Sequence, residues 1–234
     1  MHRWGLNEGI ENHLTVAIKV GSDDRYLVIP YGIMWNEVRA STLLLLDDQG
    51  RVCEGEGSPD PTAFFIHACI HKARGDSAKA IMHTHQSYTS ALCCAEHADG
   101  GGKMGELAMT HQNSLRFFDD IVYDSTYNGL VLDDSEGERI VSVMGEKRVY
   151  MHQHHGPIVA ARTVARALDD MYFLERAAKV QIMAESTGRK LLTVEDRTAR
   201  SFREASDLHG DEWAETALQA YFRQLDREEP DYKE

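Results

Sequence analysis

Short apolar runs bounded by turn residues recur through the first half of the chain and predict β-strands. Residues 14–20 and 26–29 flank the polar turn 21–24, a pattern that predicts a hairpin. Residues 42–47 predict another strand, followed by a tight turn into Val52. Further strands are expected at the run that ends in His83 and at residues 121–123, 149–151 and 157–161.

Apolar residues repeated every three to four positions predict a long helix over residues 163–187, ended by Gly188. The segment Ser58-Pro-Asp-Pro61 predicts the start of a helix to about residue 74, with Asp60 favoured at its positive N-terminal end. Further helices are expected at 87–95, 133–143, 193–206 and 211–226, followed by a charged, exposed tail. Strands that alternate with helices, with no dividing linker, predict one layered α/β or α+β domain over residues 1–234.

The charge and composition narrow the function classes. The 234 residues carry a formal net charge of −13, which disfavours a general nucleic-acid binder because the phosphate backbone would be repelled. No apolar run approaches the ~20 residues that a membrane-spanning helix needs, and the N-terminus has no signal-peptide pattern. The four cysteines show no Cys-x-x-Cys spacing, and reduced thiols fit a cytoplasmic location.

Two clusters of histidines each follow an apolar, strand-like run. His83 and His85 alternate at the end of the first run, so their imidazoles would leave the same face of a strand. His152, His154 and His155 follow the second run and can supply a third ligand. Three histidines that leave open positions on the ion are typical of a catalytic metal site. Chance pairing of packed histidines is the alternative, since the chain contains 12 of them.

Two other motifs favour structural roles. His67 and His71 lie four positions apart on the helix that begins near Pro61, but they lack the His-Glu-x-x-His pattern, so we expect them in the core or an interface. The glycine-rich segment 97–105 lacks the spacing of a Walker loop and predicts a flexible hinge or lid.

With both histidine clusters in place, the chain resembles the class II aldolase/adducin family over nearly its whole length. The matching blocks, in this order, are Asn12-His13-Leu14-Thr15, Ile29-Pro30-Tyr31-Gly32, Met82-His83-Thr84-His85 and His155-Gly156. The resemblance implies a three-layer α/β/α fold around a mixed, largely antiparallel sheet, usually assembled as a homotetramer. It also implies a divalent metal ion, Mn²⁺ or Zn²⁺, held by His83, His85 and His155.

One position departs from the family pattern. The family's aldolases carry a Glu, which acts as acid/base and can ligate the metal, four residues before the residue matching His67; this chain has Ala63 there. Asp60 or Thr62 could substitute, although capping the helix is the simpler role for Asp60. Retro-aldol cleavage needs a base for a hydroxyl proton, whereas decarboxylation starts from an ionised carboxylate. The missing Glu therefore favours the family branch that decarboxylates hydroxylated phthalates and the 3-hydroxy-2-methylpyridine-4,5-dicarboxylate of vitamin B6 breakdown.

The resulting hypothesis is a metal-dependent decarboxylase of an anionic, ortho-hydroxylated aromatic or pyridine dicarboxylate. The candidate acids for the ring carbon are His154 and Tyr127, and the candidates for binding the second carboxylate are His13, Arg148 and Arg162. A packing role for Tyr127 and surface ion pairs for the arginines are the alternatives. Three other functions stay open: an aldolase or epimerase of a small hydroxy-carbonyl compound with Asp60 as acid/base, a non-catalytic adducin-like scaffold, and metal storage.

Overall fold

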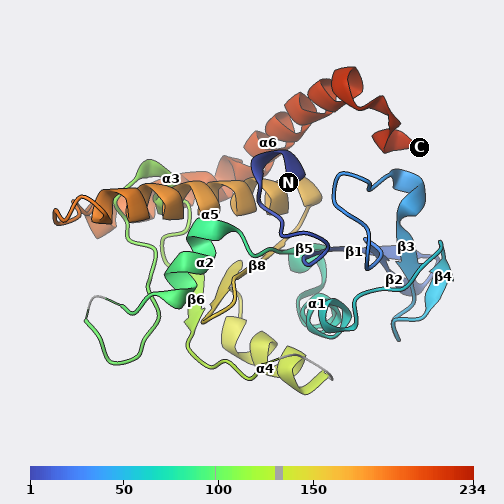
Figure 1. Cartoon of the computed structure of the whole chain (residues 1–234), viewed down its shortest axis with the longest axis horizontal. Coiled ribbons are helices and arrows are strands. Elements are labelled where there is room, and N and C mark those ends of the chain that lie inside the picture. Colours follow the sequence, from blue (N-terminus) through green and yellow to red (C-terminus); the bar gives the residue numbers. More distant parts are fainter. Residues whose placement is uncertain (98, 130–133) are drawn as a thin grey trace.

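The computed structural model describes residues 1–97, 99–129 and 134–234, and its strands form one eight-stranded sheet in the order β4-β3-β2-β1-β5-β8-β7-β6 (Figure 1). Only β6 and β7 are parallel, and every other neighbouring pair is antiparallel. The predicted mixed, largely antiparallel sheet is therefore confirmed. The strands are β1 His13–Val20, β2 Asp23–Val28, β3 Leu44–Leu46, β4 Val52–Glu54, β5 Ala80–His83, β6 Ile121–Asp124, β7 Val149–His152 and β8 Pro157–Ala161.

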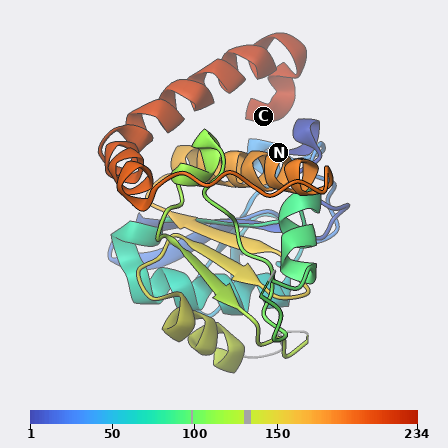
Figure 2. The same ribbon diagram turned by 90° about the vertical axis from the view of Figure 1, so that its left-hand side faces the viewer.

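Helices cover both faces of this sheet, which gives the expected three layers (Figure 2). On one face, α1 (Pro61–Arg74) packs against α4 (Asp134–Met144). The other face carries α2 (Ser87–Cys94), α3 (Gln112–Leu115) and α5 (Val164–Glu185), and α6 (Asp196–Glu228) packs on α5. Short 3₁₀ turns complete the chain: η1 His2–Trp4, η2 Ala40–Thr42, η3 Gly75–Ala78 and η4 Pro230–Lys233.

The central strands are apolar on both faces because each face has its own core. Met82 of β5 packs in the cluster that contains Met171 of α5. Its neighbour Ile81 points to the opposite face and packs in the cluster that contains Ile70 of α1. This alternation follows from the two-residue period of a strand. The polar histidines therefore begin only where β5 and β7 end.

The C-terminal region differs from the expectation. Residues 207–210, expected to separate two helices, are helical and lie inside α6. Gly210 is required there by a close contact, since a Cβ at this position would lie 1.7 Å from Nη1 of Arg166 on α5. The tail is charged and mostly exposed, as expected, and two contacts hold it: Asp231 pairs with Arg39 at 2.5 Å, and the Glu234 carbonyl accepts from the Ser41 amide at 2.6 Å.

Two smaller features concern the start of α4 and the cysteines. Residue 133, expected to begin a helix, lies outside the described residues, and α4 is described from Asp134. Of the adjacent cysteines, Cys93 is buried but Cys94 is exposed.

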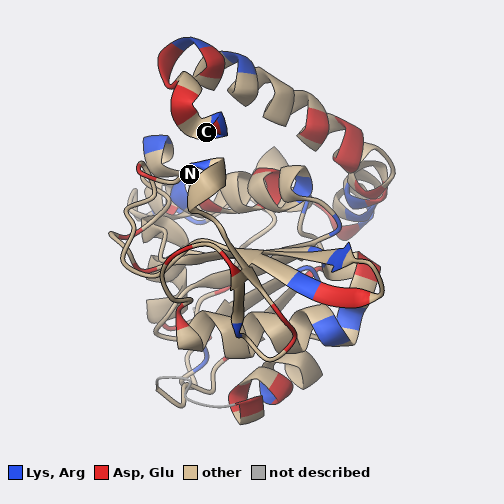
Figure 3. Cartoon of the chain, turned by 90° about the vertical axis from the view of Figure 1, so that its right-hand side faces the viewer, with Lys and Arg blue, Asp and Glu red and all other residues tan. Residues whose placement is uncertain are grey.

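Acidic and basic residues are interspersed on the face drawn in Figure 3, with several acidic segments along α6. In the described part of the chain, no helix has the length and apolar character needed to span a membrane.

Candidate metal centre

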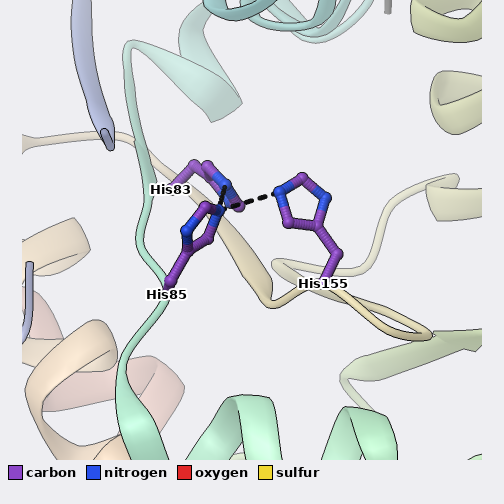
Figure 4. A group of neighbouring side chains, drawn as sticks. All are labelled: His83, His85 and His155. Atoms are coloured by element: carbon purple, nitrogen blue, oxygen red, sulfur yellow. Dashed lines mark hydrogen bonds between the residues drawn. The ribbon is translucent and has the colours of Figure 1, made fainter. Parts of the chain in front are cut away.

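Three imidazoles converge at one end of the central strands (Figure 4). Nε2 of His85 lies 3.0 Å from Nε2 of His83 and 2.9 Å from Nε2 of His155. Nitrogen ligands at ~2.1 Å from a tetrahedral zinc ion are separated by about 3.4 Å, so a small outward shift of these rings would accommodate one ion. The cluster therefore fits a single divalent metal with three nitrogen ligands.

The strand pairing brings the three ligands together. β5 pairs with β8 so that His83 lies opposite Ile158, and the turn from β7 into β8 carries His155 beside the end of β5. Gly156 allows this approach, because a Cβ there would lie only 2.7 Å from the Thr84 carbonyl oxygen. A larger residue at position 156 would push the turn and His155 away from β5.

Hydrogen bonds at the far side of two rings orient them toward the centre. Nδ1 of His83 donates to the Pro157 carbonyl oxygen at 2.9 Å, and Nδ1 of His85 donates to Oε2 of Glu8 at 2.7 Å. Because a carbonyl and a carboxylate can only accept, both Nδ1 atoms carry the proton and both Nε2 atoms present lone pairs. Such partners are typical of metal-binding histidines.

The surroundings also keep His83 and His155 neutral. Burial lowers the pKa of His83 well below its usual value, and the nearby imidazoles of His155, His13 and His85 lower it further. Burial, with contributions from His85, His152 and His13, lowers the pKa of His155 to about 3. A neutral imidazole is the form that binds a metal, so these two ligands need not lose a proton at neutral pH.

A cavity of about 130 Å³ opens beside the cluster. Its apolar wall is formed by Ile66, Ile140 and Ile158. Its polar lining includes Asn12, His13, Asp60, Thr62, His67, Tyr127 and His152. An apolar protein cavity of about 150 Å³ holds one benzene molecule, so the space beside the histidines suits a single small ring.

The first turn of α1 lies along this cavity without the family carboxylate. Ala63 lines the cavity and contributes only a methyl group. Asp60 caps α1 as expected, since its Oδ1 accepts from the Ala63 amide at 3.1 Å. Its Oδ2 lies 3.3 Å from Nε2 of His13. Burial alone would raise the pKa of Asp60, but His13 and the Ala63 and Thr62 amides lower it overall. Asp60 is therefore both a cap and an ionised carboxylate facing the cavity.

His67 contributes a lone pair whose position follows from a buried hydrogen-bond chain. Nδ1 of His71 donates to the Ala78 carbonyl at 2.6 Å, which leaves Nε2 of neutral His71 as an acceptor. The Thr15 hydroxyl donates to that atom at 2.7 Å and accepts from Nδ1 of His67 at 2.9 Å. Nε2 of His67 is therefore unprotonated. Burial, with the neighbouring imidazoles of His13 and His71, lowers the pKa of His67 well below its usual value, so the acceptor persists.

Asn12, which directly precedes β1, contributes a donor to the cavity wall. Its backbone φ of 138° is strained for a residue with a side chain. Its Oδ1 accepts from the Glu8 amide at 2.7 Å. Its side chain is buried, and Nδ2 has no hydrogen-bond partner among the described residues. A buried amide nitrogen without a partner is destabilising, so it suits an acceptor on a bound molecule.

Of the other predicted site residues, the structure places Tyr127 and His13 in the cavity wall but not His154. His154 is exposed, and its backbone amide donates to the Cys93 carbonyl at 3.1 Å. Its neighbour His152 lines the cavity instead and donates from Nε2 to the Thr126 carbonyl at 2.8 Å. The alternation of side chains around the turn thus separates two histidines that the sequence presents as equivalent.

The two predicted arginines lie at the opposite end of the sheet, which corrects the expectation that they bind substrate here. Arg148 precedes β7, whereas the histidine cluster follows its other end. Its guanidinium is held by Asp120 at 3.0 Å and by Asp207 at 2.9 Å. Arg162 follows β8, whose first residue is next to Gly156. A strand of five residues spans roughly 16 Å, so neither arginine reaches the cavity.

Sequence reasoning missed Glu8, the cavity-facing role of His152 and the hydrogen-bond chain behind His67. Glu8 meets His85 across 77 positions of sequence, and nothing in the local pattern of residues 1–11 indicates that contact. The sequence could have indicated Asn12 as a site residue, because it directly precedes His13 in a block that resembles the family pattern.

Comparisons with known proteins agree with this geometry. The model of the Class II Aldolase and Adducin N-terminal domain matches residues 1–182. A protein of Caulobacter vibrioides named for the class 2 aldolases is 32% identical over 99% of this chain and 86% of its own length. The Decarboxylase NovR of Streptomyces niveus is 26% identical over 78% of this chain and 64% of its own length.

Two solved structures superimpose on the whole chain. An aldolase II superfamily protein from Pseudomonas syringae has a TM-score of 0.88 and 27% identity, with 90% of its chain covered. The L-fuculose 1-phosphate aldolase from Glaciozyma antarctica has a TM-score of 0.81 and 25% identity, with 87% of its chain covered.

Proposed function

Since this chain belongs to the class II aldolase and adducin family, we propose that it is a metal-dependent carbon–carbon lyase, and specifically a decarboxylase. Its proposed substrate is an ortho-hydroxylated aromatic or pyridine carboxylate of the 3-hydroxy-2-methylpyridine-4,5-dicarboxylate type. The proposed ligands of the metal, Mn²⁺ or Zn²⁺, are His83, His85 and His155.

The observation that carries this proposal is Ala63 in the cavity wall. The position that holds the acid/base Glu in the family's aldolases has no ionisable group here, and the space is bounded by three isoleucines. A flat ring that already bears an ionised carboxylate needs no base to begin bond cleavage. The similarity to a decarboxylase of Streptomyces niveus supports the same choice.

A bound divalent ion would supply positive charge to the ring oxygen and adjacent carboxylate of the substrate. The chain's own groups would complete the site around that substrate. Nε2 of His67 would accept a hydrogen bond from a substrate hydroxyl, and Nδ2 of Asn12 would donate to a carboxylate oxygen. The isoleucine wall would hold the ring and exclude water from one of its faces.

Tyr127 is proposed to donate the proton that the ring carbon takes up after CO₂ has left. As the carboxylate leaves as CO₂, the electron pair of the broken bond passes into the ring, and the ring carbon must then take up one proton. The Tyr127 ring lies 6.4 Å from the His155 ring, centre to centre, and lines the cavity. The Tyr127→Phe variant should therefore lose activity with its metal content unchanged, whereas His154→Ala should keep both.

Aldol cleavage or epimerisation is the second candidate, favoured by one specific feature. The Asp60 carboxylate lies in the cavity 3.3 Å from Nε2 of His13 and could act as the base that Ala63 lacks. The fold likeness to an L-fuculose 1-phosphate aldolase is consistent with such chemistry.

We also propose that the protein assembles as a homotetramer, as the family resemblance implies. Tyr127 is 48% exposed in the single chain, so a neighbouring subunit could complete its side of the cavity. Light scattering at micromolar concentration tests this proposal, and a 26.4 kDa species alone would refute it.

The direct test of the reaction is CO₂ release by metal-loaded protein from a series of single-ring ortho-hydroxy acids, including 3-hydroxy-2-methylpyridine-4,5-dicarboxylate. Turnover should require the metal. Methylation of the ring hydroxyl should slow it on the order of 10³-fold, by analogy with loss of an oxyanion-hole donor. Cleavage of a hydroxy-carbonyl compound with no CO₂ from any of the acids would establish the aldolase alternative.

A further inference from the structure

A second cavity, of about 380 Å³, lies at the end of the sheet opposite the histidine cluster. We call it the distal arginine cavity. Its lining consists of Arg74, Ser77, Glu146, Arg148, Ala161, Arg162, Arg166, Asp207 and Asp211. These residues come from the ends of α1, β8 and α5, from η3, from the segment before β7, and from α6. The cavity therefore gathers four guanidinium groups from four parts of the chain, together with the carboxylates of Glu146, Asp207 and Asp211, in a protein whose net charge is −13.

Three of the arginines that line this cavity have a buried donor without an acceptor. The Arg166 side chain is 3% exposed; its Nε donates to Asp170 at 2.9 Å, but its Nη2 has no hydrogen-bond partner among the described residues. The same holds for Nη2 of Arg148 and Nε of Arg74. A buried donor left without an acceptor destabilises the fold, and more so when the group is charged. Three arginines of the lining thus each carry a buried nitrogen that lacks an acceptor.

The carboxylates in the lining leave some of the arginines without an ionic partner. Asp207 is shared by Arg148 and Arg203, at 2.9 Å and 2.8 Å. Among the described residues, no carboxylate lies within ion-pair distance of Arg74 or Arg162. Arg74 donates instead to the carbonyls of Lys147 and Glu146, at 2.6 Å and 3.2 Å. In the described part of the chain, therefore, neither the Arg74 nor the Arg162 guanidinium has its charge neutralised by an ion pair.

From this arrangement we propose that the distal arginine cavity binds a phosphate group, as inorganic phosphate or as a small phosphate monoester. A phosphate offers several acceptor oxygens, and the planar fork of arginine matches them with paired hydrogen bonds. The length of β8 separates this site from the metal centre. Its occupant would bridge the ends of α1, β8 and α5, whose arginines line the cavity.

The test is isothermal titration of inorganic phosphate into metal-loaded protein, with chloride at matched ionic strength as the reference. A parallel titration uses the His85→Ala variant, because that change removes phosphate binding at the metal centre. The distal site predicts one binding event per chain that persists in His85→Ala. Glycerol 3-phosphate as a second titrant distinguishes a monoester site from one for free phosphate.

Two variants locate the binding. Arg162→Gln removes an exposed guanidinium without touching the buried ion pairs, and should weaken phosphate binding at least tenfold. Ser77→Asp places a competing carboxylate beside Arg74 and should have the same effect. Arg189→Gln, another exposed arginine far from the cavity, is the matched control and should bind as the parent does. Loss of all phosphate binding in His85→Ala, or unchanged binding in Arg162→Gln and Ser77→Asp, would overturn the proposal.

Discussion

The contact between Glu8 and His85 allows a prediction that depends on the structure alone. The Glu8 carboxylate accepts from Nδ1 of His85 at 2.7 Å and so fixes the ring with Nε2 toward the metal. Glu8→Ala should therefore weaken metal binding while leaving all three ligands in place. The fold should be unaffected, because the Glu8 side chain is 66% exposed.

The size of the effect follows from the type of contact. Loss of a partner that orients a metal ligand costs 10–100-fold in affinity. The exposure of Glu8 and the intact bond from His83 to the Pro157 carbonyl place this case at the lower end. We expect about a tenfold rise in the Kd for Zn²⁺, or about 1.4 kcal/mol.

Competition with a chromophoric chelator measures this Kd. Glu8→Gln should bind almost as the parent does, because the amide oxygen still accepts from Nδ1. Glu11→Ala is the matched control, since Glu11 is exposed, belongs to the same segment and lines the cavity without contacting a ligand histidine. An unchanged Kd in Glu8→Ala, or an equal rise in Glu11→Ala, would refute the orienting role.

Three further predictions concern the cavity, the buried histidines and α6. Ala63→Glu should lower CO₂ release at least tenfold, because its carboxylate would repel the substrate's own; faster turnover, or new aldol cleavage, would contradict the proposed chemistry. Burial lowers the pKa of His71 to about 4, against ~6.5 when unfolded, so the unfolded chain takes up the extra proton. Stability should therefore fall by about 2 kcal/mol from pH 7 to pH 5 on account of this residue, and urea titrations of His71→Gln should show a smaller loss. Gly210→Ala should displace Arg166 from Asp170 and destabilise the protein by about 3 kcal/mol in urea unfolding, whereas stabilisation by about 1 kcal/mol would mean that the helix surface is open there.

The elements that the sequence predicted well are those in which a local pattern decides the outcome. The apolar runs at residues 149–151 and 157–161 correspond to β7 and β8, and Asp60 caps α1 as its position indicated. The periodic apolar residues of 163–187 form α5. The helix break expected near residue 207 does not occur. Gly210 packs closely against Arg166 of α5, and a contact between two helices cannot be predicted from the local sequence pattern.

In the candidate site, too, local patterns could be predicted and contacts between distant parts of the chain could not. The pairing of His83 with His85 and a third ligand from residues 152–155 could be anticipated from two strand-like runs that each end in histidines, whereas the choice of His155 rested on the family resemblance. His152 lines the cavity and His154 is exposed because of the backbone conformation of the turn, in which His154 has a φ of 60°. The arginines were misplaced because charge complementarity to a substrate says nothing about which end of a strand a residue occupies.

The three-histidine centre is the basis of the whole account, and metal analysis of purified variants tests it most directly. Wild-type protein loaded with Zn²⁺ or Mn²⁺ and freed of excess ion should contain one ion per chain. His83→Ala, His85→Ala and His155→Ala should each lose most of it while remaining folded, and His67→Ala should retain it. Full metal occupancy in all three ligand variants would contradict the account.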